Sequence, residues 1–318
     1  MRYFRLLITL LMLLTCTVMV RAQYDAQFSN YFMAMGYYNP GYAGTTEDLN
    51  LFGIHRQQWV GINGAPKSFF VMADMPLTLG KTKLGVGVVA FTESIGLFQN
   101  THLAGQFAYK RSLFGGTLSL GLQIGIANQS FDGTKIYIPE SSYHSPATED
   151  EALPDKKVQA MVLDMNAGVF YQHKNFYAGL GVTHLSEPEM QLEENAYTYI
   201  GRAFNFTGGY NIQMNNPLYE LQPSVFMKTD MQSFQADITA RLIYNKMFNG
   251  GLSWRVNESI VVLLGVTFGR FQAGYAYDFP TSPILKGSSG SHEFMIRYRL
   301  KLKKTKTGKY RHKSVRIL

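Results

Sequence analysis

The chain of 318 residues contains one cysteine and no long apolar run after residue 22. The cysteine, Cys16, lies in an N-terminal apolar stretch, so the rest of the chain has no disulfide and no thiol chemistry. The longest later apolar run, at residues 260–266 and their neighbours, has about eight residues, whereas a spanning helix requires roughly 20. Helical periodicity is also scarce. These absences argue against a helical membrane protein and against a disulfide-stapled domain.

The first 22 residues have the three parts of a secretory signal peptide. Arg2 and Arg5 precede an apolar stretch, and Ala22 supplies a small residue at its end. We therefore predict cleavage after Ala22. A lipoprotein leader that ends at Cys16 is the alternative, because residues 13–16 loosely resemble a lipobox.

Acidic residues are absent from the last 16 positions, where positive charge is concentrated. Residues 23–302 have 20 basic and 22 acidic residues, so the basicity is local and does not predict a nucleic-acid partner. We expect the basic tail to be a docking arm for an acidic partner surface. A solvated tail attracted to anionic headgroups is the alternative. The seven cations of the tail are Lys303, Lys304, Lys306, Lys309, Arg311, Lys313 and Arg316.

Apolar and polar residues alternate with a period of two throughout the body of the chain. One example is residues 118–127, where every second residue is Leu or Ile and the intervening ones are Ser, Gly, Gln or Ala. A strand with one lipid-like face and one polar, glycine-rich face is typical of an outer-membrane barrel. The 44 aromatic residues, often near strand ends, suit interfacial girdles. We therefore predict an all-β transmembrane antiparallel β-barrel.

Fourteen alternating segments lie between residues 50 and 302, an even number that a closed antiparallel barrel needs. Long connections at 130–159, 186–198 and 280–290 follow odd-numbered strands, and short ones mostly follow even-numbered strands. Because barrels have short periplasmic turns, we expect both termini in the periplasm. The predicted domains are a signal peptide (1–22), an N-terminal plug segment (23–48), the barrel (49–302) and a basic periplasmic tail (303–318).

Charged residues on the inward faces of the predicted strands are expected to order the barrel interior, with permeation as a second role. They are Asp237, Arg241, Asp278, Glu293, Arg297 and Arg299.

Motifs for catalysis or cofactor binding are weak. The sequence GVGVVA at residues 85–90 lies within one alternating strand and lacks the helix that a dinucleotide fingerprint requires. The seven histidines are scattered without a pair at i, i+4, so we expect no metal site. No G-x-S-x-G occurs, and we expect neither an enzyme nor a cofactor. The acidic loop residues at 149–155 and 187–194 leave Ca²⁺ binding as an open alternative.

The segment QYDAQFSNYFMAMGYYNPGYAG (residues 23–44) and the stretch RQQWVGINGAP (56–66) carry the most specific pattern. Together they resemble the PorP/SprF family of Bacteroidetes outer-membrane proteins linked to type IX secretion. Ala26 and Gly41 depart from the family's usual Pro and Ala. The principal matching residues are Asp25, Phe28, Ser29, Asn39, Pro40, Tyr42, Ala43, Gly44, Arg56, Gln58, Trp59 and Gly61.

The resemblance implies an outer-membrane component of the type IX secretion system without enzymatic activity. Its implied partners are periplasmic ring, motor and peptidoglycan-binding proteins of the machine, or, in some members, a secreted surface cargo. The outside of the barrel is also expected to contact outer-membrane lipid. Cargo-anchoring members would use the outer loops, and docking members would use the periplasmic face.

Aromatic residues in 23–48 would cost solubility if exposed, so we expect this segment to fold into or against the periplasmic mouth as a plug.

A passive FadL-like channel for small hydrophobic molecules is the alternative function, because such channels also have fourteen strands and an N-terminal plug. The WVGINGAP stretch and the basic tail favour secretion.

Overall fold

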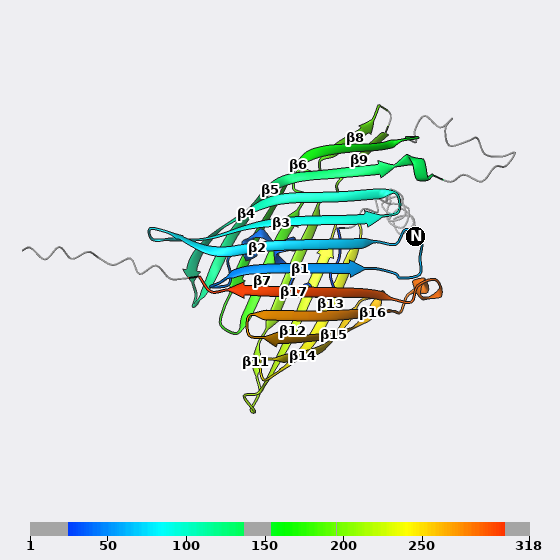
Figure 1. Ribbon diagram of the computed structural model, residues 1–318. Helices are drawn as coiled ribbons and strands as arrows, with labels where there is room; N and C mark the ends of the chain where they lie inside the picture. The colour runs from blue at the N-terminus through cyan, green and yellow to red at the C-terminus, as the bar shows by residue number, and fades with distance from the viewer. Residues whose placement is uncertain (1–24, 137–153, 195, 303–318) are drawn as a thin grey trace, which may run out of the picture.

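The computed structural model describes residues 25–136, 154–194 and 196–302. Within these residues, fourteen antiparallel strands form a closed barrel (Figure 1), which confirms the predicted fold. The strands are β1 (Leu49–Gln57), β2 (Lys67–Leu79), β3 (Thr82–Ile95), β4 (Phe98–Leu113), β5 (Gly116–Asp132), β6 (Lys157–Gln172), β7 (Phe176–Thr183), β10 (Ala203–Tyr210) with its continuation β11 (Ile212–Gln213), β12 (Tyr219–Thr229), β13 (Phe234–Tyr244), β14 (Phe248–Arg255), β15 (Ser259–Phe268), β16 (Phe271–Pro280) and β17 (Ser291–Leu300).

The barrel closes where the first strand pairs with the last. In this pairing Leu49 lies opposite Leu300 and Gln57 lies opposite His292. On the far side, β10 pairs with both β7 and β12, and β11 pairs with β12 in the same register. No sheet edge of the barrel is therefore left open among the described strands, as a barrel in lipid requires.

Side chains of the strands alternate between lipid and lumen. Along β5, Leu122 and Ile124 are exposed, whereas Ser119, Gln123 and Ala127 are buried inside. Exposed Leu, Ile, Val and Phe cover the outside of most strands, as a lipid-facing wall requires. None of the helices that the structure describes is long and apolar enough to cross a membrane.

The two ends of the barrel differ in their connections. At the end where β17 finishes, which we call the turn end, the links are short, such as residues 80–81 and 269–270. The opposite end, the loop end, has the long links, including 133–156 and 184–202. The link after β7 was expected to be a simple loop, but it contains a hairpin of β8 (Glu189–Glu193) and β9 (Ala196–Tyr199). A short helix, η4 (Pro283–Lys286), lies in the link after β16.

The N-terminal segment, residues 25–48, runs lengthwise through the lumen. Asp25 contacts Thr183 and His184 at the loop end, and Gly44 contacts Asp74, in the half of β2 nearer the turn end. Between them lie the helical turns α2 (Met35–Tyr38) and η1 (Pro40–Tyr42). Most residues from Ala26 to Ala43 are buried, so the segment forms the core of the barrel interior.

Glycines on the inner wall make room for this segment. A Cβ added at Gly121 on β5 would overlap the backbone of Gly41, and one at Gly85 on β3 would overlap the carbonyl of Ala43. Gly181 on β7 lies equally close to the Tyr38 carbonyl. The glycine-rich inward faces therefore allow close approach of another backbone.

Several expectations fall partly or wholly outside the described residues. These are the signal peptide (1–22), the basic tail (303–318), the acidic residues Glu149, Asp150 and Glu151, and both chain termini. The described chain begins with Asp25 at the loop end. It ends with Leu302, two residues after β17 finishes at the turn end. The N-terminal segment thus runs through the lumen from the loop end, whereas the expected position was in or against the periplasmic mouth.

Candidate functional site

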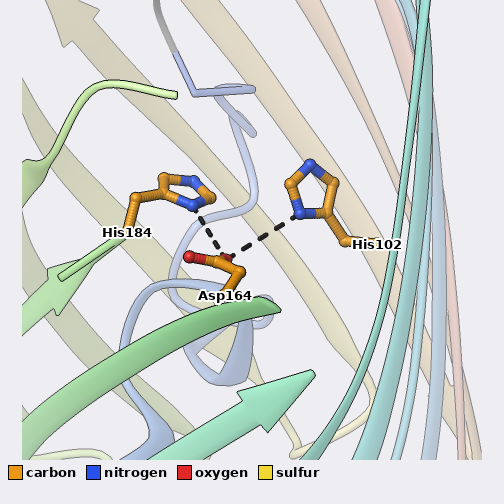
Figure 2. A group of neighbouring side chains, drawn as sticks. All are labelled: His102, Asp164 and His184. Carbon is orange, nitrogen blue, oxygen red and sulfur yellow. Dashed lines mark hydrogen bonds and ion pairs between the residues drawn. The ribbon is translucent and has the colours of Figure 1, made fainter. Parts of the chain in front are cut away.

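The contacts between the N-terminal segment and the inner wall form the candidate functional site, and they begin at Asp25. Asp25 Oδ1 lies 2.9 Å from His184 Nε2, and Asp25 Oδ2 accepts a hydrogen bond of 2.8 Å from Thr183 Oγ1. The backbone carbonyl of Asp25 accepts a bond of 2.6 Å from Lys228 Nζ. His184 Nδ1 in turn lies 2.8 Å from Asp164 Oδ2 (Figure 2). One imidazole therefore joins two carboxylates at the start of the segment.

Charges at this contact shift the pKa of both partners. Burial alone would lower the pKa of His184, but the charge of Asp25 and hydrogen bonds to Asp164 and Asp25 raise it to about 10. Burial would raise the pKa of Asp25, yet His184 and Lys228 hold it well below its usual range. Each group therefore favours the charged form of the other.

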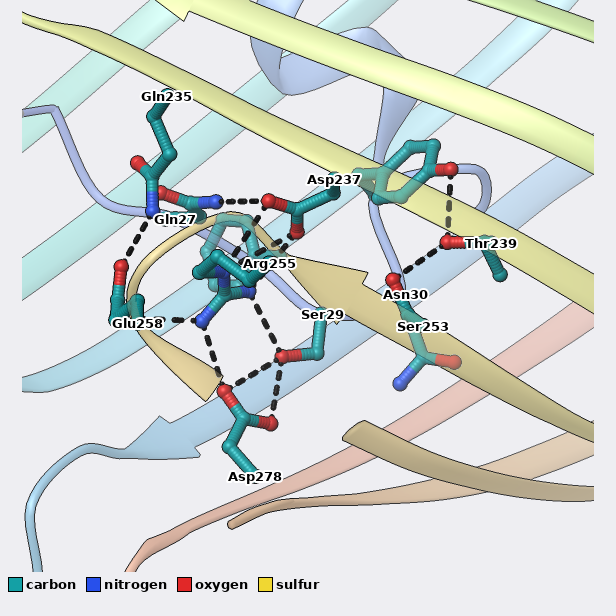
Figure 3. A network of polar contacts seen from close by, with 12 residues as sticks. Gln27, Ser29, Asn30, Gln235, Asp237, Thr239, Ser253, Arg255, Glu258 and Asp278 are labelled. Atoms are coloured by element: carbon teal, nitrogen blue, oxygen red, sulfur yellow. Dashed lines mark hydrogen bonds and ion pairs between the residues drawn. The ribbon is translucent and has the colours of Figure 1, made fainter. Parts of the chain in front are cut away.

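Ser29 lies at the centre of a second group of buried charges (Figure 3). Its hydroxyl donates to Asp278 Oδ1 at 2.7 Å and accepts from Arg56 Nη1 at 2.9 Å and Arg255 Nη2 at 3.1 Å. Both guanidinium groups also contact Asp278 Oδ2, at 2.7 Å from Arg56 and 2.8 Å from Arg255. A single serine of the segment is thus fitted between two arginines and a carboxylate of the wall.

Neighbouring residues extend this network along the segment. Glu293 accepts hydrogen bonds of 2.7 Å from the backbone nitrogens of Ser29 and Asn30. Gln27 Nε2 donates to Asp237 Oδ1 at 2.9 Å, and Asp237 also binds the Arg255 guanidinium. Desolvated charges are stable only when paired and hydrogen-bonded, and Gln27, Ser29 and Asn30 of the segment supply several of these hydrogen bonds.

The charged residues predicted to face the lumen divide into three groups. Asp237, Asp278 and Glu293 belong to the network around Ser29. Arg241 and Arg297 contact the segment further along: the Arg241 guanidinium lies 3.5 Å from the Phe32 ring centroid, and Arg297 donates to the Met33 carbonyl at 2.9 Å. Arg299 is only half-buried and lies near the turn end, away from the network.

Aromatic side chains fill the lumen beside the charges. Tyr37 of the segment packs against Phe28, Phe70 and Phe91 with ring centroids 5.1–5.3 Å apart. On the other side of the lumen, Tyr38 and Tyr31 pack against Phe226 at 4.5 Å and 5.2 Å. Each buried ring contributes about 1.5–3 kcal/mol, so the aromatic core fixes the segment strongly.

The Asn-Pro-Gly turn fastens the segment to the backbone of the wall. Asn39 Oδ1 accepts from the Gly41 nitrogen at 2.9 Å, and Nδ2 donates to the carbonyls of Val169 at 3.0 Å and Leu180 at 3.1 Å. Among the next residues that match the family pattern, Pro40 begins η1 and Ala43 is fully buried. Tyr42 packs edge-on against Phe170, and Gly44, with φ of +63°, donates to Asp74.

The remaining matched residues lie outside the lumen, in the link between β1 and β2 at the loop end. Gln58 donates its backbone N–H to the Pro66 carbonyl, and the Trp59 nitrogen donates to Ser291 Oγ at 3.1 Å. Trp59 and Gly61 both have positive φ, of 49° and 104°. The RQQWVGINGAP stretch therefore contributes Arg56 to the lumen and a folded rim that contacts the link before β17.

Two acidic residues of the link between β7 and β10 are paired with cations in the structure. Glu193 lies 2.6 Å from Lys156, and Glu187 lies 3.4 Å from Arg202. Neither carboxylate belongs to the group of converging ligand side chains found among the described residues, and a Ca²⁺ site requires six or more converging oxygens. Of the link that contains the first acidic cluster, the structure describes residues 133–136 and 154–156.

Comparison with known proteins gives the family. The model for the type IX secretion system membrane protein PorP/SprF matches residues 20–298. The chain belongs to the PorP/SprF family. This membership and the closed barrel together identify an outer-membrane component of the type IX secretion system. The comparison with curated proteins found no match.

Solved structures with a similar shape are other outer-membrane barrels. The toluene transporter TbuX of Ralstonia pickettii matches with a TM-score of 0.48 and 11% identity over 85% of this PorP/SprF chain and 94% of TbuX. The toluene transporter TodX of Pseudomonas putida matches with a TM-score of 0.47 and 9% identity over 87% and 95% of the two chains. BamA of Haemophilus ducreyi matches with a TM-score of 0.42 and 7% identity over 80% and 70%. At these low sequence identities the comparison concerns the fold and not the ligand of this chain.

Sequence reasoning missed several residues that the fold brings to the segment. Arg255 is buried at the centre of the Ser29 network, but the sequence shows it only as the last residue of a short strand. His102, Asp164 and His184 come from three different strands or strand ends, so their spacing along the chain carries no signal. The sequence indicated only which residues of β4, β6 and β7 face the lumen, and not that these three side chains meet there.

Proposed function

We propose that this PorP/SprF chain serves type IX secretion as a closed, non-enzymatic outer-membrane scaffold. In this role the barrel presents surfaces to partners at its two ends and carries no solute through its lumen. The single observation that supports this proposal is the N-terminal segment, which occupies the lumen from the loop end to the half nearer the turn end. A passage for solute would require the segment to leave a network of buried charges.

Cavities along the segment are too small for a permeating solute. Three cavities that segment residues line have volumes of about 50, 30 and 10 Å³. Sites for small molecules usually have about 300–1,000 Å³. The alternative function, a FadL-like passive channel for small hydrophobic molecules, is therefore less well supported than the scaffold.

The proposed orientation places the turn end in the periplasm and the loop end outside the cell, because outer-membrane barrels have short periplasmic turns. The tail after Leu302 would then reach periplasmic parts of the secretion machine, with its seven Lys and Arg residues against an acidic partner surface. The rim at residues 58–66, the β8–β9 hairpin and the link before β17 would face secreted cargo.

A genetic complementation experiment tests this function. A strain that lacks the gene is complemented with the wild-type chain or with the control variant Arg270→Met, which changes one exposed turn-end cation. We expect the null strain to lose secreted proteins and to keep normal uptake of hydrophobic nutrients, and both complemented strains to recover secretion. Normal secretion with impaired uptake in the null strain would instead support the channel.

A further inference from the structure

Three metal-ligating side chains converge inside the barrel, near the loop end (Figure 2). His102 comes from β4, Asp164 from β6 and His184 follows β7. Their ligand atoms all lie within 4.8 Å of one another. Asp164 Oδ2 is 2.8 Å from His184 Nδ1 and 4.0 Å from His102 Nδ1. The two histidines therefore present the same ring nitrogen to one carboxylate.

One oxygen of this carboxylate has no partner. Asp164 is 5% exposed, and its Oδ1 forms no hydrogen bond with any described residue. A buried carboxylate oxygen without a partner costs free energy, which a bound cation would remove. His102 has no hydrogen bond to the carboxylate either, since its nearest approach is 4.0 Å.

Asp25 holds the neighbouring histidine from the other side. Its Oδ1 lies 2.9 Å from His184 Nε2, so a proton on Nε2 leaves Nδ1 to coordinate a metal once its own proton is released. Metal-binding histidines almost always donate the second ring N–H to a carboxylate, a backbone carbonyl or a water, which fixes the ring orientation. The backbone of His184 is also fixed, because its nitrogen donates to Asn166 Oδ1 at 2.8 Å.

Space for solvent adjoins the cluster. A cavity of about 30 Å³ is lined by Asp25, His102, Asp164 and His184, and a second one of about 50 Å³ is lined by three of the same four residues. A water molecule needs about 10–15 Å³, so either cavity can hold a water as a further ligand.

We propose that His102, Asp164 and His184 bind a divalent transition-metal ion, with Zn²⁺ as the best match and a water in the fourth position. Imidazole nitrogen and carboxylate oxygen are ligands that Zn²⁺ accepts, with bonds of about 2.0–2.2 Å in tetrahedral geometry. Such bonds separate ligand atoms by roughly 3.3–3.4 Å, whereas the two measured separations are 2.8 and 4.0 Å. Binding therefore requires His184 to move slightly away from Asp164 and His102 to move closer to it.

The ion would join β4, β6 and the end of β7, and through Asp25 it would also hold the start of the N-terminal segment. Metal binding and the fit of the segment at the loop end are therefore coupled. Histidine spacing along the chain predicted no metal site, because these two histidines are 82 positions apart in the sequence but adjacent in the barrel.

A Zn²⁺ titration of the full mature chain, purified in detergent without a histidine tag and stripped with a chelator, tests this proposal. We expect one Zn²⁺ per wild-type chain in competition with a chromophoric chelator. His102→Ala and His184→Ala should each weaken binding at least tenfold, and Asp25→Asn should weaken it about 10–100-fold. His292→Ala is the matched control, since His292 lies at the same end but bonds Tyr275, and it should bind as the wild type does.

Co²⁺ provides a second measurement that depends on no variant. A tetrahedral site should give strong visible absorption bands when the wild-type chain is loaded with Co²⁺, and Zn²⁺ should remove them. Equal Zn²⁺ uptake by the wild type and the His102→Ala/His184→Ala double variant would overturn the proposal. Absence of the Co²⁺ bands in the wild type, or equal loss of binding in His292→Ala, would overturn it as well.

Discussion

Replacing Arg255 with methionine should destabilise the barrel by an amount that the structure allows us to estimate. The Arg255 side chain is 1% exposed and contacts Asp237 at 3.1–3.2 Å and Asp278 at 2.8 Å. After the change Asp278 keeps Arg56 at 2.7 Å, whereas Asp237 loses its guanidinium partner and keeps the Gln27 amide at 2.9 Å. One buried carboxylate therefore loses its ion pair.

Removal of one partner from a buried ion pair costs about 3–5 kcal/mol. For a chain of this size each kcal/mol lowers the unfolding midpoint by about 2–4 °C, so Arg255→Met should unfold roughly 6–20 °C below the wild type. The midpoint can be measured in detergent from the gel mobility of unheated and heated samples. Arg270→Met, at an exposed turn residue, is the control and should change the free energy of unfolding by less than about 0.5 kcal/mol.

The double variant Arg255→Met/Asp237→Asn separates charge from packing. It removes the uncompensated carboxylate and should recover much of the lost stability, with an interaction energy of about 0.5–3 kcal/mol. Chymotrypsin supplies a second readout, because the segment is rich in buried aromatic residues and should be cut only after it loosens. An Arg255→Met midpoint equal to that of Arg270→Met would refute the buried network.

Two further changes test other parts of the account. Gly121→Leu places a side chain where the Gly41 backbone lies, so the segment should be displaced and become open to chymotrypsin, whereas Gly105→Leu, at a position with open space, should leave it protected. Removal of residues 303–318 should leave the barrel assembled but weaken co-purification with periplasmic partners, most strongly at low salt. Unchanged recovery of every partner at low salt would contradict the docking arm.

Much of the barrel could be predicted from the sequence because its signal is local. Alternation along β5 or β13 depends only on neighbouring residues, and lipid on one side makes that pattern strict. The β8–β9 hairpin was missed, since its strands are only five and four residues long and Met190 is their one fully buried side chain, too little to mark an alternating pattern.

The contacts inside the lumen could be predicted only in part. The inward faces of β13, β16 and β17 revealed Asp237, Asp278 and Glu293, but not that they bind Ser29 and Gln27 more than 200 positions away. Those contacts depend on the path of the N-terminal segment through the barrel, which no local pattern contains. The convergence of His102 with His184 depends in the same way on the pairing of β4 through β7.

Conductance in planar bilayers tests most directly whether the N-terminal segment closes the barrel. The mature chain should conduct no measurable current, and a variant that lacks residues 23–44 should form open pores, because the Ser29 network and the aromatic core then lose the groups that fill the lumen. Gel mobility confirms that the deletion variant is a folded barrel. Equal conductance of the two proteins would contradict the account.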